Sequence, residues 1–459
     1  MITPKKLKIY NSKDIDSIPQ ISILSENELF ALKVVATVLP FRTNNYVLKE
    51  LINWNNIPED PIYQLNFMQK DMLTRIQFDE MASAIKRNNP YEIKNTAIKI
   101  RTELNPHPAG QTKVNIPELN NEPVPGLQHK YKETALVFPS KSQTCQAYCT
   151  FCFRWAQFVD VNDIKFSTCN KTGFLSYLQQ HKEITDILLT GGDPMIMSAK
   201  NLKEFISPLL KPEFEHIQSI RIGTKSLSYW PYRFVTDKDA DEILKLFEHV
   251  KNSKKNISLM AHFNHYVELS TDVVKEAIKR ILSTGTQIRT QSPVIKYIND
   301  EPNVWEKMWK DQVALGCVPY YMFVERDTGA NNYFEISLLK AYNIYREAII
   351  KTSGLCRTVR GPVMSALPGK VMVNGITQIN GEKVFQLNLI QGRNPEWCYK
   401  PFYAKFDPSA KWLSHLKPAF GKTKFFYQDE INKILIDSEN YDLSFNDDLL
   451  NSQFQLNYD

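Results

Sequence analysis

The sequence has little of what a membrane-bound or exported protein needs. No apolar run approaches the roughly 18 residues of a membrane-spanning helix, and the most apolar helical candidate, Leu29–Phe41, is interrupted by Lys33. The amino-terminal segment Met1–Ser12 carries lysines but no apolar run behind them, so it does not resemble a signal peptide. We therefore expect a protein of the cytoplasm that has no membrane partner.

The sequence also has few cysteines, which are unevenly distributed, and it has no long basic segment. Seven cysteines occur in 459 residues, and three of them fall between positions 145 and 152, which does not fit the even framework of a disulfide-rich secreted protein. The net charge of +6 comes without a long block of Lys or Arg, which argues against nucleic acid as a partner. Hydrophobic residues make up 43% of the chain, enough for a large core spread over two or three domains or a barrel with additions.

Short apolar runs alternate with longer amphipathic ones between residues 126 and 345. Six of these runs predict strands, each followed by a helical pattern: Ala135–Pro139, Ile184–Thr190, Ser219–Thr224, Ile257–His262, Gln287–Ser292 and Val318–Val324. Such an alternation is typical of parallel β/α units. Because a closed barrel needs eight units, we expect the α/β class with an incomplete (β/α)6 barrel, whose chemistry lies at the carboxyl ends of the strands.

The region before the predicted barrel, residues 1–125, has a different pattern. Apolar residues at three- and four-residue spacing predict helices in Glu26–Phe41, Val47–Asn55 and Pro61–Ala84. Five prolines in Asn105–Gly126 predict an extended connector. We therefore expect a helical amino-terminal region that is joined to the barrel by this connector.

The region after the barrel, residues 346–459, predicts a smaller α+β extension. A Pro- and Gly-containing loop is expected at Arg360–Lys370, and two strands at Val371–Ile379 and Glu382–Ile390. The last stretch, Asp437–Asp459, is acidic and polar, as in a peripheral helix or a partly ordered end.

The three crowded cysteines carry the sharpest chemical signal. Cys145, Cys149 and Cys152 have the spacing C-x3-C-x2-C and directly follow a predicted strand. Thiolates are the preferred ligands of iron–sulfur clusters, and three of them leave one iron of a cube open for a small molecule. A structural zinc site is the alternative, but zinc favours a fourth Cys or His at paired spacing, and the sequence has no second C-x2-C.

These cysteines resemble the signature of the radical S-adenosylmethionine superfamily, and a longer resemblance points to its lysine 2,3-aminomutase family. The matching stretches run in order from about Pro123 to Gly375: Pro123–Tyr131, the cysteine loop, Leu189–Pro194, Ile220–Thr224, His262–His265, Gln291–Ser292, Ile298–Asp300, Pro319–Tyr321 and Pro368–Lys370. The resemblance implies a radical enzyme that uses a [4Fe–4S] cluster, S-adenosylmethionine and pyridoxal 5'-phosphate to move an amino group from the α- to the β-carbon of a free amino acid.

The resemblance also assigns roles to single residues. It implies that Cys145, Cys149 and Cys152 hold the cluster and that Gly191, Gly192 and Asp193 meet the methionine amino group, with Gln291 near the nucleoside. It implies that Lys370 carries pyridoxal phosphate, that Lys130 faces the phosphate, and that Arg154 pairs with the substrate α-carboxylate. It further implies a small reducing partner such as flavodoxin or ferredoxin, and a possible homo-oligomer. The family's run of four glycines before the lysine is not present in Ala366–Gly369.

Two departures concern the substrate. Lysine aminomutases hold the distal ammonium of lysine with two aspartates, and ungapped matching places Arg326 and Val363 at those positions. An arginine repels an ammonium, so the substrate is predicted to be an acidic or neutral amino acid, with Arg326 as a binding residue. An ion pair of Arg326 with Glu325 or Asp327 is the structural alternative.

Two other functions fit part of the pattern. A radical S-adenosylmethionine enzyme could modify a peptide or another substrate without pyridoxal phosphate. A non-enzymatic iron–sulfur or zinc protein would need only the cysteines. Formation of 5'-deoxyadenosine and an absorbance band that depends on Lys370 distinguish these possibilities.

Overall fold

The computed structural model describes residues 2–105, 113–159, 167 and 171–436. Its main feature is an eleven-stranded sheet with the order β15-β14-β13-β12-β11-β10-β9-β8-β7-β6-β5. The strands of this sheet are β5 Leu127–Tyr131, β6 Thr134–Val137, β7 Asp186–Leu189, β8 Ser219–Thr224, β9 Asn256–His262, β10 Gln287–Val294, β11 Val318–Val324, β12 Arg360–Ser365, β13 Gly369–Ile379, β14 Glu382–Gly392 and β15 Pro401–Lys405. Cys169, the predicted tail Asp437–Asp459 and part of the predicted connector lie outside the described residues.

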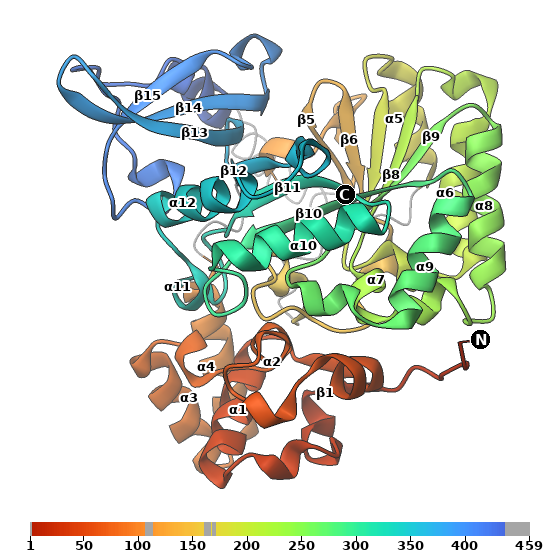
Figure 1. Ribbon diagram of the computed structural model, residues 1–459, viewed down its shortest axis with the longest axis vertical. Helices are drawn as coiled ribbons and strands as arrows, with labels where there is room; N and C mark the ends of the chain where they lie inside the picture. Colours follow the sequence, from red (N-terminus) through yellow and green to blue (C-terminus); the bar gives the residue numbers. More distant parts are fainter. Residues whose placement is uncertain (1, 106–112, 160–166, 168–170, 437–459) are drawn as a thin grey trace, which may run out of the picture.

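The central strands run parallel, as the sequence predicts. Each of the six expected strands is found, from β6 to β11, and each pairs in parallel with its neighbour in the chain. The crossover helices are α5 Lys171–Gln180, α6 Ala199–Ile206, α8 Ala240–Asn252, α9 Asp272–Ser283, α10 Pro302–Ala314 and α12 Leu338–Ile349. The α/β class is therefore confirmed, and six helices connect successive parallel strands (Figure 1).

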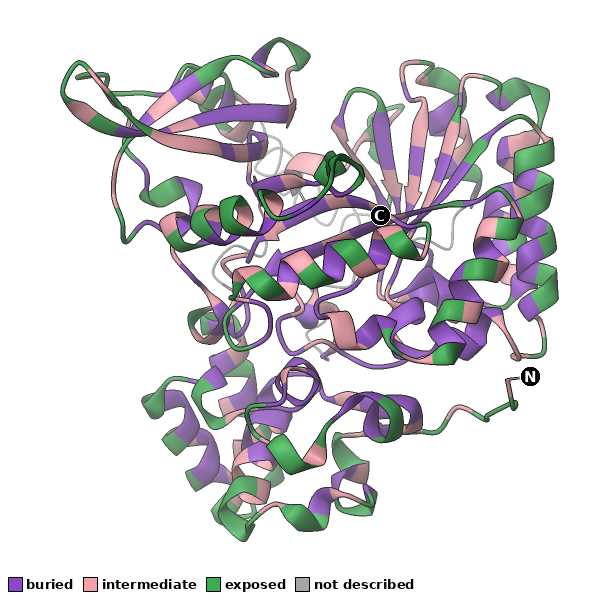
Figure 2. Cartoon of the chain, viewed as in Figure 1, coloured by how far each residue is buried: buried purple, intermediate pink, exposed green. Residues whose placement is uncertain are grey.

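These helices bury one stripe each against the sheet. In α8 the buried side chains are Ile243, Leu246, Phe247 and Val250, spaced at three and four residues, while charged residues face out. Figure 2 shows the same pattern along α6, α8, α9 and α10, with buried and exposed residues on opposite sides. A continuous apolar core forms between these stripes and the strands.

The carboxy-terminal region corrects one prediction. Arg360–Ser365 is strand β12, parallel to β11, rather than part of a loop. The apolar residues from Pro362 to Met364 fill the edge of the parallel sheet, where they are buried. The predicted loop is reduced to a tight turn at Ala366–Pro368, after which β13, β14 and β15 extend the sheet antiparallel.

The amino-terminal region is helical, with one correction. Its helices are α1 Glu26–Val38, α2 Pro61–Asn66, α3 Arg75–Lys86 and α4 Pro90–Glu103. The segment Pro61–Ala84, predicted as helical throughout, is divided, because Asp60 caps α2 and Thr74 caps a separate helix, α3. A short antiparallel ladder, β1 Ile9–Asn11 with β2 Arg42–Asn44, also forms.

This helical region lies beside the central sheet, on the side of α7 Ser226–Tyr229 and α11 Asn331–Phe334 (Figure 1). One hydrophobic cluster joins residues of the amino-terminal helices to Ala147, Phe151 and Trp155 of the cysteine loop. The two parts therefore share a core. None of the helices in the described ranges has the length and apolar character to cross a membrane.

Candidate active site

The cysteine loop, the Gly-Gly-Asp segment, Gln291 and Arg326 lie toward one edge of the parallel sheet. The cysteine loop follows β6, the Gly-Gly-Asp segment follows β7, and Lys225 follows β8. His262 ends β9, Gln291 lies in β10, and Arg326 follows β11. Because carboxyl ends of parallel strands share one edge of a sheet, segments that are far apart in the sequence meet there.

The cysteine loop is held by the amino-terminal region, which the sequence alone did not indicate. The Asn66 amide donates to the Tyr148 carbonyl at 3.0 Å, and the buried Asn44 amide donates to the carbonyls of Gln146 at 3.2 Å and Tyr229 at 2.9 Å. The Thr150 backbone also donates to the Leu65 carbonyl at 3.0 Å. The loop therefore has a fixed path before any ligand binds.

These contacts give a prediction for Asn66→Leu. We expect this variant to lose reconstituted iron to a chelator at least several-fold faster, because a buried carbonyl left without its donor costs roughly 1–3 kcal/mol. The measurement is the rate of iron release under anaerobic conditions.

The matched control is Asn89→Ala, which removes the amino-terminal cap of α4 in the same region but does not touch the cysteine loop. Its unfolding temperature is expected to fall while iron release keeps the wild-type rate. Equal iron release from both variants would count against a specific role for Asn66.

The three thiols are partly exposed and lie close enough to influence one another. Burial raises the pKa of Cys149 to about 11 and that of Cys152 to about 12, and the neighbouring Cys149 adds to the shift at Cys152. Burial also raises the pKa of Cys145 well above its usual value. Three thiolates in this loop therefore need a cationic ligand, as an iron–sulfur cluster supplies.

The three cysteine sulfur atoms do not all lie within 4.8 Å of one another, as the ligand atoms of a single ion would. In a tetrahedral zinc site the ligand sulfurs lie roughly 4 Å apart. In the described part of the chain, one group brings three potential ligand atoms within 4.8 Å of one another, and it does not include these cysteines. The Tyr229 hydroxyl lies 3.2 Å from Cys149 Sγ and provides an outer contact.

The two glycines of the Gly-Gly-Asp segment are required by close packing on the chain before Cys145. A Cβ at Gly192 would lie 2.4 Å from the Thr144 carbonyl oxygen, and one at Gly191, whose φ is +145°, would lie 2.5 Å from Ser142 Oγ. The Asp193 backbone N–H donates to the Thr144 carbonyl at 2.8 Å. These glycines therefore let the loops after β6 and β7 touch.

The Asp193 carboxylate is already engaged within the protein. It accepts hydrogen bonds from Met195 N at 2.9 Å, Thr224 Oγ1 at 2.7 Å, Lys225 N at 2.8 Å and Ser226 Oγ at 3.1 Å. Burial raises its pKa despite these donors. The carboxylate thus joins the ends of β7 and β8.

Two arginines flank one exposed ring beside the cysteines. The guanidinium carbons of Arg154 and Arg326 lie 5.2 and 5.5 Å from the centre of the Phe153 ring. Arg154 also donates to the Gly191 carbonyl at 3.2 Å, and burial lowers its pKa to about 10. Arg326 Nε is buried and has no hydrogen-bond partner among the described residues. It can therefore donate a hydrogen bond to a ligand anion here.

Lys370 begins β13 and points into an aromatic pocket. Its amine donates to Gln391 Oε1 at 2.5 Å and lies 4.9 Å from the ring centre of Tyr131 and 5.3 Å from that of Tyr321. The turn before it depends on Gly369, where a Cβ would lie 2.1 Å from the Gln391 carbonyl oxygen. The lysine is therefore placed by the pairing of β13 with β14.

A substantial fraction of the Lys370 amine is neutral near pH 7. Burial lowers its pKa from 10.5 to about 7, the positive charges of Arg221 and Arg360 lower it further, and Asp186 opposes the shift. A neutral amine is the nucleophilic form of lysine. The neutral form of Lys370 can therefore attack a carbonyl carbon as a nucleophile.

A cluster of cations lies next to Lys370. The pKa of Lys130 falls well below its usual value because of burial and because Arg393, Arg326 and Lys370 are close. Lys130 donates to the Ala366 carbonyl, and no carboxylate counters it in the described residues. Like charges gathered in a poorly solvated space need an anion, and a phosphate group fits this requirement.

Sequence reasoning missed Arg393, Gln391 and Tyr131 as parts of this pocket. Arg393 follows β14 and is anchored by donating to the Leu367 carbonyl at 2.9 Å. No local pattern could have identified it, because Lys130 lies on β5 at the opposite edge of the parallel strands.

Gln291 Nε2 lies 2.7 Å from His262 Nε2, and burial lowers the pKa of His262 to about 3. Gln291 is therefore held at the mouth of the site by a neutral histidine.

Comparison with known proteins identifies the family. A protein of Aquifex aeolicus (strain VF5), named "Putative L-lysine 2,3-aminomutase", is 31% identical over 411 residues, which are 89% of this chain and 95% of that protein. The L-lysine 2,3-aminomutase of Acetoanaerobium sticklandii is 28% identical over 67% of this chain and 71% of its own length. No family model matches the chain. The extent of the first match, over nearly the whole of both proteins, places this chain in the lysine 2,3-aminomutase family.

Proposed function

We propose that this chain is a radical S-adenosylmethionine enzyme, an isomerase that moves the amino group of a free amino acid between its α- and β-carbons. Its cofactors would be a [4Fe–4S] cluster on Cys145, Cys149 and Cys152, S-adenosylmethionine, and pyridoxal 5'-phosphate on Lys370. The observation that carries the proposal is the pairing of a lysine of lowered pKa with a cluster of buried cations in one pocket. The parallel strands from β6 to β12 would form the incomplete barrel.

When bound, the cluster and S-adenosylmethionine supply a carbon radical, and pyridoxal phosphate supplies an electron sink for the migrating nitrogen. The chain positions these groups. Lys370 offers the neutral amine for attachment, and Lys130, Arg326 and Arg393 offer positive charge for a phosphate. Arg154 lies between the cysteines and the Gly191 carbonyl, where its planar fork can pair with a carboxylate.

The substrate is proposed to be an acidic or neutral amino acid rather than lysine. Val363 is fully buried in β12 and offers no charge. Arg326 and Arg154 both contact Phe153, so a second carboxylate in the substrate would meet a guanidinium. A distal ammonium at this place would instead be repelled.

The variant Arg326→Leu tests this substrate class. We expect KM for the best acidic substrate to rise about 30- to 100-fold, because removing one member of a buried charge pair costs roughly 2–3 kcal/mol. The experiment is an anaerobic screen of amino acids on reconstituted protein, with β-isomers measured by mass spectrometry.

Arg326→Lys is the matched control, since it keeps the charge but loses the planar fork, and an intermediate loss is expected. Preferential turnover of lysine by the wild-type protein would disprove the substrate class and leave the cofactor assignment standing. A small reducing protein such as flavodoxin or ferredoxin is proposed as the electron donor.

The second candidate is a radical enzyme that works without pyridoxal phosphate. It is favoured by the change in the segment before Lys370, where Ala366 and Leu367 occupy positions that are glycines in the resemblance. In that case S-adenosylmethionine would be cleaved while added pyridoxal phosphate fails to attach to Lys370.

A further inference from the structure

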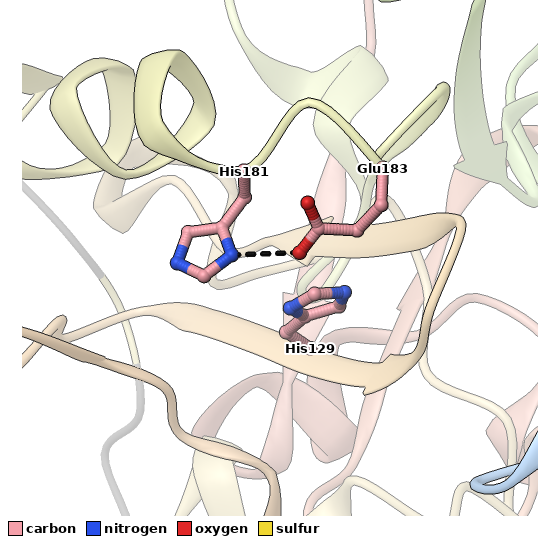
Figure 3. Close-up of side chains that lie close together, drawn as sticks. All are labelled: His129, His181 and Glu183. Atoms are coloured by element: carbon pink, nitrogen blue, oxygen red, sulfur yellow. Dashed lines mark hydrogen bonds and ion pairs between the residues drawn. The ribbon is translucent and has the colours of Figure 1, made fainter.

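A histidine pair and a carboxylate meet at the strand ends that lie away from the cysteine loop. His129 lies on β5, His181 follows α5, and Glu183 lies before β7 (Figure 3). Tyr131 pairs with Thr134 at the start of β6, and Thr134 pairs with Asp186 at the start of β7. The group therefore lies at the amino ends of the parallel strands, opposite the cysteine loop.

We propose that His129, His181 and Glu183 form a binding site for a zinc-like divalent cation. One ligand atom from each residue lies within 4.8 Å of the others. Two imidazoles and a carboxylate are a common ligand set for zinc, and they leave a fourth position for water. The three side chains come from two segments of the chain, so the cation would tie β5 to the segment between α5 and β7.

The rings are held in place before any cation binds. The His181 ring stacks on Tyr177 with centres 3.9 Å apart and an angle of 23°. The His129 ring meets both of these rings edge-on, with centres 5.8 Å from Tyr177 and 5.9 Å from His181. Rotation of the imidazoles is therefore limited, which lowers the entropy that binding would cost.

The hydrogen bonds of His129 fix which nitrogen can bind a cation. Its Nε2 lies 3.1 Å from the Lys132 carbonyl oxygen, which can only accept, so Nε2 carries the proton. The lone pair is then on Nδ1, which accepts from the Tyr177 hydroxyl at 2.8 Å. A backbone carbonyl that holds the far nitrogen of a histidine is the usual outer contact of a metal ligand. The Tyr177 oxygen lies where the cation would bind, so the His129 ring must shift away from Tyr177 to make room for it.

The His181–Glu183 pair supplies the other two ligands. His181 Nδ1 lies 2.7 Å from Glu183 Oε1, and this contact lowers the pKa of the Glu183 carboxyl although burial opposes the shift. Glu183 is therefore an anion at neutral pH. Because the carboxylate can only accept, His181 Nδ1 carries the proton of this contact. A zinc ion with ligand bonds of about 2.0–2.2 Å would take the place of that proton, which is released to solvent, with a small movement of the glutamate.

The test uses untagged protein with its cluster reconstituted, so that the cysteines are occupied. Zn²⁺ alone is the probe, with competition against a fluorescent zinc indicator and metal analysis after gel filtration. We expect one zinc per chain beyond the iron, and at least a tenfold weaker affinity in both His181→Gln and Glu183→Gln. His249→Gln, an exposed histidine on α8, is the matched control and should bind zinc as the wild type does.

Three outcomes would overturn the site. They are no zinc beyond the iron in the wild type, an unchanged affinity in Glu183→Gln, and an equal loss in His249→Gln. Glu183 is exposed, so its conservative replacement keeps the fold, and the iron content of each variant checks this. A rise in unfolding temperature with added Zn²⁺ in the wild type but not in Glu183→Gln would support the site independently of affinity.

Discussion

Lys370→Ala is expected to abolish amine migration while leaving cleavage of S-adenosylmethionine detectable. The pKa of this lysine is lowered to about 7, and its amine faces two aromatic rings beside a cluster of cations. Without it, pyridoxal phosphate has no covalent anchor and the substrate has no electron sink. We expect product formation to fall by at least about 1,000-fold, as when an essential catalytic group is removed.

The pH dependence of cofactor attachment gives a second readout for the same residue. A lysine with an ordinary pKa of 10.5 would be almost fully protonated, and so unreactive, at neutral pH. The pKa of Lys370 is lowered to about 7, so the reactive neutral fraction rises from below to above half between pH 6 and pH 8. Attachment to the cofactor-free protein, followed by reductive trapping and peptide mass spectrometry, should show a midpoint near pH 7.

The control for these experiments is Lys383→Ala. This lysine lies on β14, remote from the pocket, with its amine 3.9 Å from the ring centre of Phe406. It should keep both attachment and turnover. Trapping of the cofactor on another lysine in the wild type, or full turnover by Lys370→Ala, would contradict the assignment of Lys370.

Cys149→Ser is expected to remove the cluster and all radical chemistry. In the proposed site each of the three thiols would provide one ligand of the cube, and a serine hydroxyl is a much poorer ligand for iron. Iron content should fall sharply, and anaerobic formation of 5'-deoxyadenosine should drop by at least about 1,000-fold. The measurements are the iron content, the visible absorbance of the cluster, and chromatography of the nucleoside.

Cys398→Ser is the matched control, because Cys398 lies beyond β14, away from the cysteine loop, and is partly exposed. It should keep wild-type iron and activity. If Cys149→Ser retains a full cluster, or if zinc replaces iron in the wild-type loop prepared without oxygen, the protein is not a radical enzyme of the proposed kind.

The contribution of the sequence differs between elements. The six parallel strands could be predicted because each is a short apolar run between amphipathic helices, and both periods are local properties of the chain. The same local rule failed at Arg360–Ser365, where Gly361 and Pro362 suggested a loop. Pairing with Tyr321 and Phe323 of β11 made this segment a strand instead.

The candidate site shows the same division. The three cysteines lie within eight consecutive residues, so the sequence by itself determined that their thiols share one loop. It also determined the resemblance to the family. The sequence did not reveal that Asn44 and Asn66 hold this loop, or that Arg393 joins Lys130, because these contacts link residues about 80 to 260 positions apart. Such contacts depend on which strands become neighbours in the sheet, and the lowered pKa of Lys370 depends on the same packing. Only the tertiary structure decided them, because burial and charge proximity are properties of the folded chain.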